Sequence, residues 1–283
     1  MVILVGSIGV MLRQTSRTGK IIRQMETEHY DISVVVLTYN RKDLLFNCLE
    51  SLFKQTHPPQ KFEIIVIDDG STDQTCQTAQ NLHRNSHAIK YIRQKHQGVA
   101  AARNTGIAHA KGSIIAFVAD DYVVPPNYVA TIARFFRDYK DALVVRFKVI
   151  GPEDTFMSRV AQLYYEVDFV TRLRGNTATK THHWSKKLRN FFARIDPPEA
   201  IITKHLDIEA AGAAAFKKEV FNRVGIFDTN LKRAEDSDMA VKMRGHGIHP
   251  YYNPRLRIVH KHSPHLIDHL RKCFSMGDRK SVV

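Results

Sequence analysis

The sequence predicts an α/β fold with a Rossmann-like, mostly parallel central sheet flanked by helices. Three observations point to this class. Apolar runs of strand length alternate with segments in which apolar residues recur at helical spacing. The runs are rich in valine and isoleucine, as is typical of strands that are buried on both faces. Three of them end in polar or acidic residues, at the edge where such sheets bind ligands.

The first βαβ unit begins near Asp31. Residues 32–37 predict a strand, which is followed by the turn Thr38-Tyr39-Asn40-Arg41. Residues 43–55 predict a helix, because leucine and other apolar residues recur there with a period close to 3.6. The next apolar run predicts a second strand over residues 61–67.

The second strand leads into the acidic segment at residues 68–73. Ser71 or Thr72 is the candidate N-cap of a helix that reaches about residue 84. A third strand is expected over residues 89–93.

An alanine-rich helix is expected over residues 98–110, and we expect Gly112 to end it. The apolar run at residues 114–118 then predicts a fourth strand. Pro125-Pro126 opens a helix over residues 127–139, because proline is favoured in the first turn.

Composition limits the kind of partner. The chain has 283 residues, which fits one large domain or two small ones, and a formal net charge of +14. Such a charge predicts an anionic partner: nucleotide phosphates, an acidic membrane surface or nucleic acid. The three cysteines, Cys48, Cys76 and Cys273, have no CxxC spacing. They indicate a reducing compartment and argue against a structural zinc site or a disulfide framework.

No segment of the sequence is long enough to span a bilayer. Residues 1–30 form a lead-in that is apolar for its first dozen residues, and its basic residues follow the apolar part rather than precede it. This order differs from that of a signal peptide. We expect the lead-in to be flexible or to touch a membrane.

Polar chemistry gathers at the carboxyl ends of three predicted strands: Thr38-Tyr39-Asn40-Arg41, Asp68-Asp69-Gly70-Ser71 and Asp120-Asp121. Each alone is consistent with ordinary turn chemistry, since Asn, Asp, Gly and Ser all favour turns. Two carboxylates at the end of a buried strand need positive charge, and oxygen ligands suit Mg²⁺ or Mn²⁺. Three such ends on one sheet edge favour a nucleotide site with a divalent cation.

These motifs, in this order, resemble the family 2 glycosyltransferases of the GT-A fold. The resemblance covers residues 31–277 apart from an insert, and its motifs lie at residues 34–41, 55–56, 67–73, 97–106, 120–125, 212–221, 224–228 and 234–239. It implies an enzyme that transfers a sugar from a nucleotide-diphosphate donor. One departure is Ala119, where many members of the family have a third acidic residue.

The resemblance also implies roles for residues of the donor half, residues 31–150. Thr38 and Tyr39 would line the base pocket, Asp69 would hydrogen-bond the base, and Asp68 would support Asp69. The remaining residues implied in donor binding are Asn40, Arg41, Gly70, Ser71, Gly98, Arg103, Asn104 and Asp120. For Arg103, an ion pair with Asp68 or Asp120 is an equally good interpretation.

The same resemblance implies that Asp121 is the direct metal ligand. Asp120 would contact the ribose or the sugar, or the metal through water. His260 or His262 would complete the metal site or contact the diphosphate, although a lone histidine is more often structural.

The acceptor half, residues 209–283, carries the segment Glu235-Asp236. By resemblance, Asp236 is the general base that deprotonates an acceptor hydroxyl, and Glu235 shapes the acceptor pocket. The simpler interpretation is that acidic residues at a helix start favour the macrodipole. The implied reaction is an inverting single displacement. The motif Q-x-x-R-W of processive relatives is absent from the sequence, so transfer of one or a few sugars is expected.

The insert at residues 151–208 departs from the family pattern. Within it, residues 170–195 are basic and interleaved with aromatic side chains. This composition fits a lid or a membrane-facing patch for an anionic, lipid-linked acceptor, and it also fits a solvated loop. Nucleic acid is not expected as a partner, because no nucleic-acid-binding module accompanies these residues.

The resemblance implies a hexosyltransferase-like enzyme that acts in cell-surface polysaccharide or glycolipid synthesis. We expect it in the cytoplasm or peripherally on the inner face of the membrane. A UDP-sugar is the favoured donor, and guanosine and deoxythymidine donors remain open. The alternatives are an inactive GT-A scaffold or binding protein and a nucleotidyltransferase, although the latter needs a glycine-rich loop that Thr38-Tyr39-Asn40-Arg41 does not provide.

Overall fold

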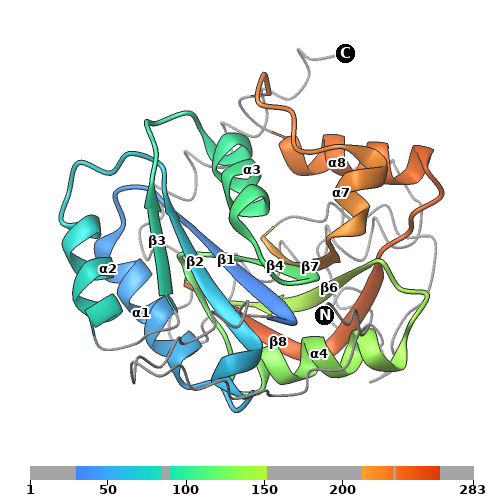
Figure 1. The fold of residues 1–283 in the computed structure, drawn as a ribbon, viewed down its shortest axis with the longest axis horizontal. Coiled ribbons are helices and arrows are strands. Elements are labelled where there is room, and N and C mark those ends of the chain that lie inside the picture. Colours follow the sequence, from blue (N-terminus) through green and yellow to red (C-terminus); the bar gives the residue numbers. More distant parts are fainter. Residues whose placement is uncertain (1–29, 85–88, 152–211, 232–233, 262–283) are drawn as a thin grey trace, which may run out of the picture.

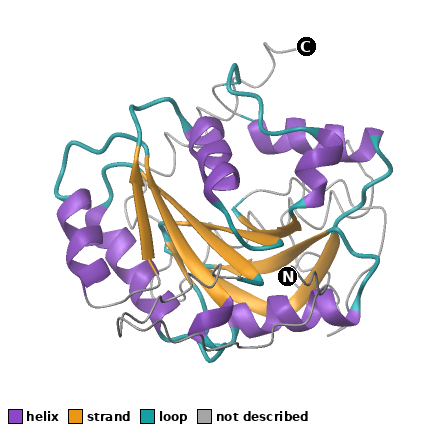
Figure 2. Cartoon of the chain, viewed as in Figure 1, coloured by secondary structure: helices purple, strands orange, loops and turns teal. Residues whose placement is uncertain are grey.

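A computed structural model of the chain describes residues 30–84, 89–151, 212–231 and 234–261. Within these residues, eight strands form one sheet in the order β3-β2-β1-β4-β7-β6-β8-β5, drawn in Figure 2 as a single curved layer between helices. The α/β prediction with a mostly parallel sheet is confirmed.

The parallel half of the sheet consists of β1 (Ile32–Thr38), β2 (Phe62–Asp68), β3 (Ile89–Arg93) and β4 (Ile114–Ala119). In the register of this half, Thr38 lies beside Asp68 and Leu37 lies beside Ala119. The polar residues that follow β1, β2 and β4 therefore leave the sheet at the same edge, as the sequence predicts.

The other half is mixed. Strand β7 (Ala213–Lys217) runs antiparallel to both β4 and β6 (Val144–Ile150). Strand β8 (Tyr251–His260) is parallel to β6, and the short β5 (Tyr122–Val123) is antiparallel to β8. The last pairing sets Tyr122 opposite His260 and so returns the chain to the end of β4.

Helices cover both faces of the sheet (Figure 1). One face packs against α1 (Lys42–Phe53), α2 (Thr75–Arg84) and α4 (Tyr128–Asp138), and the other against α3 (Val99–His109), α7 (Glu219–Val224) and α8 (Glu235–Gly245). Alternate residues of β1 point to opposite cores, Val34 to the first and Val35 to the second. A 3-10 turn, η1 (Pro59–Lys61), precedes β2.

Helix α3 lies directly on β1 because of a glycine. A Cβ atom at Gly106 would lie 2.4 Å from Cγ1 of the buried Val35. Real Cβ atoms do not approach so closely, so any larger residue would push the helix and the strand apart.

Two helix boundaries differ from the sequence prediction. Neither Ser71 nor Thr72 caps α2, because the helix begins at Thr75. The Thr75 backbone amide instead donates to the Asp73 carboxylate over 2.9 Å. Helix α3 ends at His109, before Gly112. The space beside Gly112 is filled by β1, since a Cβ there would lie 2.6 Å from the amide nitrogen of Ser33.

Several predictions fall outside the described residues. These are the predictions for the lead-in, for the basic segment at residues 170–195 and for His262. In the part of the chain that the structure describes, no helix is both long enough and apolar enough to cross a membrane.

Candidate active site

A cavity of about 370 Å³ opens at the carboxyl ends of β1, β2 and β4. This volume is within the range of small-molecule sites. The sequence-predicted residues that line it come from four separate segments: Thr38, Tyr39, Arg41, Asp69, Gly98, Arg103 and Asp120. The predicted convergence of strand ends therefore produces a real concavity.

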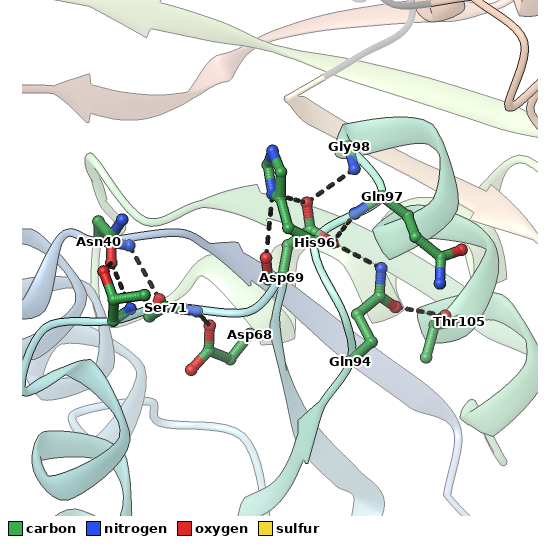
Figure 3. A network of polar contacts seen from close by, with 10 residues as sticks. Asn40, Asp68, Asp69, Ser71, Gln94, His96, Gln97, Gly98 and Thr105 are labelled. Atoms are coloured by element: carbon green, nitrogen blue, oxygen red, sulfur yellow. Dashed lines mark hydrogen bonds and ion pairs between the residues drawn. The ribbon is translucent and has the colours of Figure 1, made fainter.

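At the end of β2, the Asp69 carboxylate is held by neutral donors (Figure 3). Its Oδ1 accepts hydrogen bonds from the Gln94 side-chain amide at 2.7 Å and the Gln97 backbone amide at 3.0 Å. Its Oδ2 accepts from the Gly98 amide at 2.8 Å. Thr105 in turn donates to Gln94 over 2.6 Å, so the network is anchored on α3.

His96 completes this network. Its Nδ1 lies 2.9 Å from Asp69 Oδ2 and 3.1 Å from the Asp69 backbone oxygen. Its ring stacks on Tyr39, with centroids 4.2 Å apart and planes inclined by 20°. Sequence reasoning missed His96 and Gln94, and it included Gln97 in the motif at residues 97–106 without assigning it a role.

Asp68, Asn40 and Ser71 shape the loops rather than line the cavity. The buried Asp68 accepts from the Ser71 amide at 2.8 Å and from the Tyr91 hydroxyl at 2.5 Å. Burial, together with this hydrogen bond, raises the pKa of Tyr91, which keeps the hydroxyl a donor. The resemblance implies that Asp68 supports Asp69, and this role stays a prediction, because the hydrogen bonds of Asp68 described above go to Ser71 and Tyr91.

Asn40 joins the β1 and β2 turns. It adopts a left-handed φ of 54°, which asparagine tolerates better than most residues. Its side-chain oxygen accepts from the Thr72 amide at 2.7 Å, and its own amide donates to Ser71 Oγ over 2.9 Å.

Gly70 allows the β2 turn to approach the next loop. Its φ is +87°, and a Cβ would lie 2.8 Å from the His96 amide nitrogen. Only glycine satisfies both conditions.

At the end of β4, two carboxylates share a guanidinium. Arg41 Nη1 lies 3.0 Å from Asp120 Oδ1 and 3.2 Å from Asp121 Oδ2. His260 Nε2, on β8, lies 3.3 Å from the same Asp121 oxygen. Burial raises the pKa of Asp120, the nearby Asp121 charge adds to that rise, and the Arg41 charge opposes it.

The β4 end fits a divalent cation. Arg41 already supplies positive charge between the two carboxylates, and an imidazole stands beside them. Oxygen and imidazole donors suit Mn²⁺. Among the described residues, no group of three or more His, Cys, Asp or Glu side chains is arranged as a ready ligand set.

Arg103, on α3, pairs with Glu235 at the start of α8. Their Nη1 and Oε1 atoms are 2.6 Å apart, and both side chains are buried. The Arg103 guanidinium also lies over the Phe227 ring, 5.1 Å from its centroid. The predicted alternative, an ion pair of Arg103 with Asp68 or Asp120, is wrong, because the guanidinium turns toward α8.

Asn104 and Asp236 do not line the cavity. The Asn104 side chain donates to the Phe227 carbonyl over 2.8 Å and accepts from the Phe227 amide at 3.0 Å. Asp236 follows Glu235 on α8, and its carboxylate accepts from the Ser237 amide at 2.9 Å. Ala234, just before them, has a left-handed φ of 64°, a conformation that costs about 1–3 kcal/mol. Local strain therefore marks the start of α8.

Known proteins with similar sequences are glycosyltransferases. A family model described as Glycosyl transferase family 2 matches residues 33–225. The chain is 27% identical over 253 residues to the uncharacterized glycosyltransferase EpsJ of Bacillus subtilis, covering 85% of this chain and 67% of EpsJ. It is 35% identical over 114 residues to glycosyltransferase GlyA of Streptococcus pneumoniae, covering 40% of this chain and 16% of GlyA.

Solved structures share the fold. Residues 1–349 of S. aureus TarS, in complex with UDP-GlcNAc, match with a TM-score of 0.59 and 20% identity over 83% of this chain and 59% of that chain. The mannosyltransferase PcManGT from Pyrobaculum calidifontis, in complex with GDP-Man and Mn²⁺, matches with a TM-score of 0.58 and 22% identity over 87% and 61%. The chain thus spans less than two thirds of these structures, and only 16% of GlyA.

The chain has the α/β GT-A fold that these solved structures share. The family model covers more than half of the chain, and the chain therefore belongs to glycosyl transferase family 2.

Proposed function

We propose that the protein transfers a sugar from a nucleotide-diphosphate sugar, with UDP-sugars favoured, to a hydroxyl acceptor by an inverting, non-processive single displacement. One observation carries the proposal. An aromatic face with a neighbouring carboxylate, at Tyr39 and Asp69, opens into the same cavity as Asp120, which belongs to the carboxylate pair at the β4 end. Tyr39 and Asp69 suit a nucleobase, and the carboxylates at the β4 end suit a diphosphate with its cation.

The matching structures support the choice of donor. TarS is in complex with UDP-GlcNAc, and PcManGT is in complex with GDP-Man and Mn²⁺. Both donors are nucleotide-diphosphate sugars. The net charge of +14 also favours an anionic substrate.

The residues at the β4 end would hold a divalent cation, Mn²⁺ or Mg²⁺. Asp121 would be the direct ligand, with Asp120 and His260 beside it. A cation held there would supply positive charge opposite the leaving diphosphate. Arg41 is 42% exposed and so has room to turn from the carboxylates toward a phosphate.

Asp236 is the proposed general base, and it takes the proton of the acceptor hydroxyl as that oxygen attacks the anomeric carbon. Inversion requires the base on the face of the sugar opposite the diphosphate. The buried Arg103–Glu235 pair joins the cavity wall to the start of α8, which supports a position for Asp236 beside the sugar.

The biological role that we propose is assembly of a cell-surface polysaccharide or glycolipid, by a protein in the cytoplasm or at the inner face of the membrane. A carbohydrate or lipid-linked acceptor fits the basic composition of residues 170–195. Binding to vesicles with and without anionic lipid tests this part separately from donor chemistry.

The central test is hydrolysis and transfer with a panel of nucleotide sugars in Mn²⁺, Mg²⁺ or EDTA. We expect metal-dependent release of one nucleoside diphosphate, reduced at least about 100-fold in Asp121→Asn, since the cation stabilises the leaving group. Asp138→Asn is the matched control, because that aspartate is exposed at the end of α4.

A second candidate, an inactive scaffold that only binds the donor, is favoured by Ala119 and by the guanidinium already seated between the carboxylates. Donor binding without turnover in any metal, in the presence of candidate acceptors, would support it and contradict the enzyme proposal.

A further inference from the structure

His96 occupies a position in the cavity that a nucleobase would use. Its ring is parallel to Tyr39 within 20° at a centroid distance of 4.2 Å, which is the geometry of a stacked aromatic pair. Its Nδ1 meets the Asp69 carboxylate at 2.9 Å. A flat ring with a ring N–H, placed against an aromatic face and a carboxylate, has the recognition chemistry of a base.

The Asp69 carboxylate has little capacity left for another donor. A carboxylate offers about four acceptor sites, two on each oxygen. Backbone or amide donors from Gln94 and Gln97 fill Oδ1, and the Gly98 amide takes one site on Oδ2. His96 Nδ1 lies 2.9 Å from Oδ2 and so stands in front of the carboxylate, while its hydrogen bond goes to the Asp69 backbone oxygen. A base that binds Asp69 through a ring N–H must therefore replace the imidazole.

The proton on His96 follows from its surroundings. Nδ1 faces two acceptors, the Asp69 carboxylate and the Asp69 carbonyl at 3.1 Å. Nδ1 must therefore carry the hydrogen for both contacts to be favourable.

His96 is also able to move. Its side chain is 56% exposed, and it lies in the loop between β3 and α3. The Asp69 side chain is only 7% exposed and keeps its amide donors when the imidazole leaves. Movement of the His96 side chain alone would therefore open the base position, while Asp69 and its amide donors stay in place.

We propose that His96 is a specificity-determining residue of the donor site: its imidazole holds the base position in the free protein, and a base with a ring N–H next to a carbonyl replaces it. Uracil, thymine and guanine carry that group, whereas adenine and cytosine do not. The inference rests on the proposed donor site and adds that the His96 imidazole competes with the base of the donor for that site.

The test is calorimetric titration of wild type, His96→Ala and His96→Phe with UDP and with inorganic pyrophosphate, at one Mn²⁺ concentration. We expect His96→Ala to bind UDP about three- to tenfold more tightly, the range for loss of one competing stacked contact. Pyrophosphate, which lacks a base, should bind wild type and both His96 variants with equal affinity. His96→Phe keeps the stack without the N–H, so its affinity for UDP should lie between the other two.

The matched control is His109→Ala. His109 is an exposed histidine on α3 whose ring contacts only its own helix, at the Thr105 carbonyl, in the contacts recorded for the described residues. It should leave the affinity for UDP unchanged. In wild type, ADP and CDP should bind more weakly than UDP.

Three results would overturn the inference. Weaker UDP binding by His96→Ala would mean that the imidazole contacts the bound base instead of giving way to it. Unchanged UDP binding would mean that His96 has no part in recognition, and the proposed donor site would stand without it. No UDP binding by wild type would remove both the inference and the favoured donor.

Discussion

The two carboxylate sites of the cavity hold their charge in opposite ways. At the β2 end, Asp69 is neutralised by amide donors from Gln94, Gln97 and Gly98, all within one loop and helix start. At the β4 end, Asp120 and Asp121 are neutralised by a cationic side chain, Arg41. The Gln97 and Gly98 amides belong to the backbone and the Gln94 side chain is held by Thr105, so these donors stay in place, whereas a half-exposed guanidinium can be exchanged for another cation.

The donors around Asp69 are therefore preformed in the free protein, whereas the cation between Asp120 and Asp121 is replaceable. Hydrogen bonds to charged groups contribute about 1.5–3 kcal/mol each, and they persist only if the donors stay in place. An ion pair with an exposed partner contributes about 0–1 kcal/mol. We therefore expect the β2 end to matter for both folding and binding, and the β4 end mainly for binding.

Arg103→Gln should have the largest effect on stability, because it removes the partner of a buried carboxylate. Breaking a buried pair costs about 3–5 kcal/mol, and Glu235 is 7% exposed. Urea unfolding measures the loss. Arg137→Gln, which breaks an exposed pair with Asp138, is the control and should change the free energy of unfolding by less than about 0.5 kcal/mol.

The double variant Arg103→Gln/Glu235→Gln sharpens that result. It should recover part of the lost stability, because no unpaired charge remains in the core. A double variant as unstable as Arg103→Gln alone would show that packing over Phe227, rather than charge, accounts for the loss.

Asp69→Asn should come next, at about 1–3 kcal/mol of unfolding free energy, because one end of the new amide must face an N–H donor. UDP binding should fall as well, measured by calorimetry on the same protein. If stability were unchanged, the amide network at the β2 end would not be a structural feature of the folded state, and the contrast with the β4 end would fail.

Arg41→Gln should change metal affinity without a comparable change in folding. Removing the competing cation should tighten Mn²⁺ binding about tenfold in the absence of donor, which corresponds to about 1.4 kcal/mol. Electron paramagnetic resonance of free Mn²⁺ measures this directly. Weaker Mn²⁺ binding would mean that Arg41 does not compete for the carboxylates.

Asp120→Asn should give the smallest effect, and one that depends on pH. The pKa of Asp120 is raised in the folded protein, so the protonated form favours folding. This contribution is complete below the unfolded value of about 3.9 and is lost as the pH rises through the folded value. In EDTA, the melting temperature of Asp120→Asn should therefore gain on that of wild type as the pH rises above about 4. A constant difference would contradict the raised pKa.

The sequence was sufficient to predict the parallel half of the sheet. Runs such as 32–37 and 114–118 are apolar throughout, and their local pattern alone identifies buried strands. Strands β6 and β8 were not predicted, because their parallel pairing joins residues about a hundred positions apart and no local pattern encodes it. The approach of His260 to Asp121 depends on that pairing.

The site was predictable where residues follow a strand directly. Thr38, Asp69 and Asp120 lie where the strand ends place them. His96 was missed because a histidine in a polar loop has no periodicity to mark it. The partner of Arg103 was missed because Glu235 is 132 residues away and meets it only through the packing of α3 and α8.

The close packing of α3 on β1 at Gly106 fixes the position of two separate contacts made by this helix. At Gly106 the helix backbone rests directly on the Val35 side chain of β1. One end of the helix offers the Gly98 amide to Asp69, and its middle offers Arg103 to Glu235. A single methyl group at position 106 would displace both contacts together. Gly106 therefore sets the distance between α3 and β1, and with it the positions of the Gly98 amide and the Arg103 side chain.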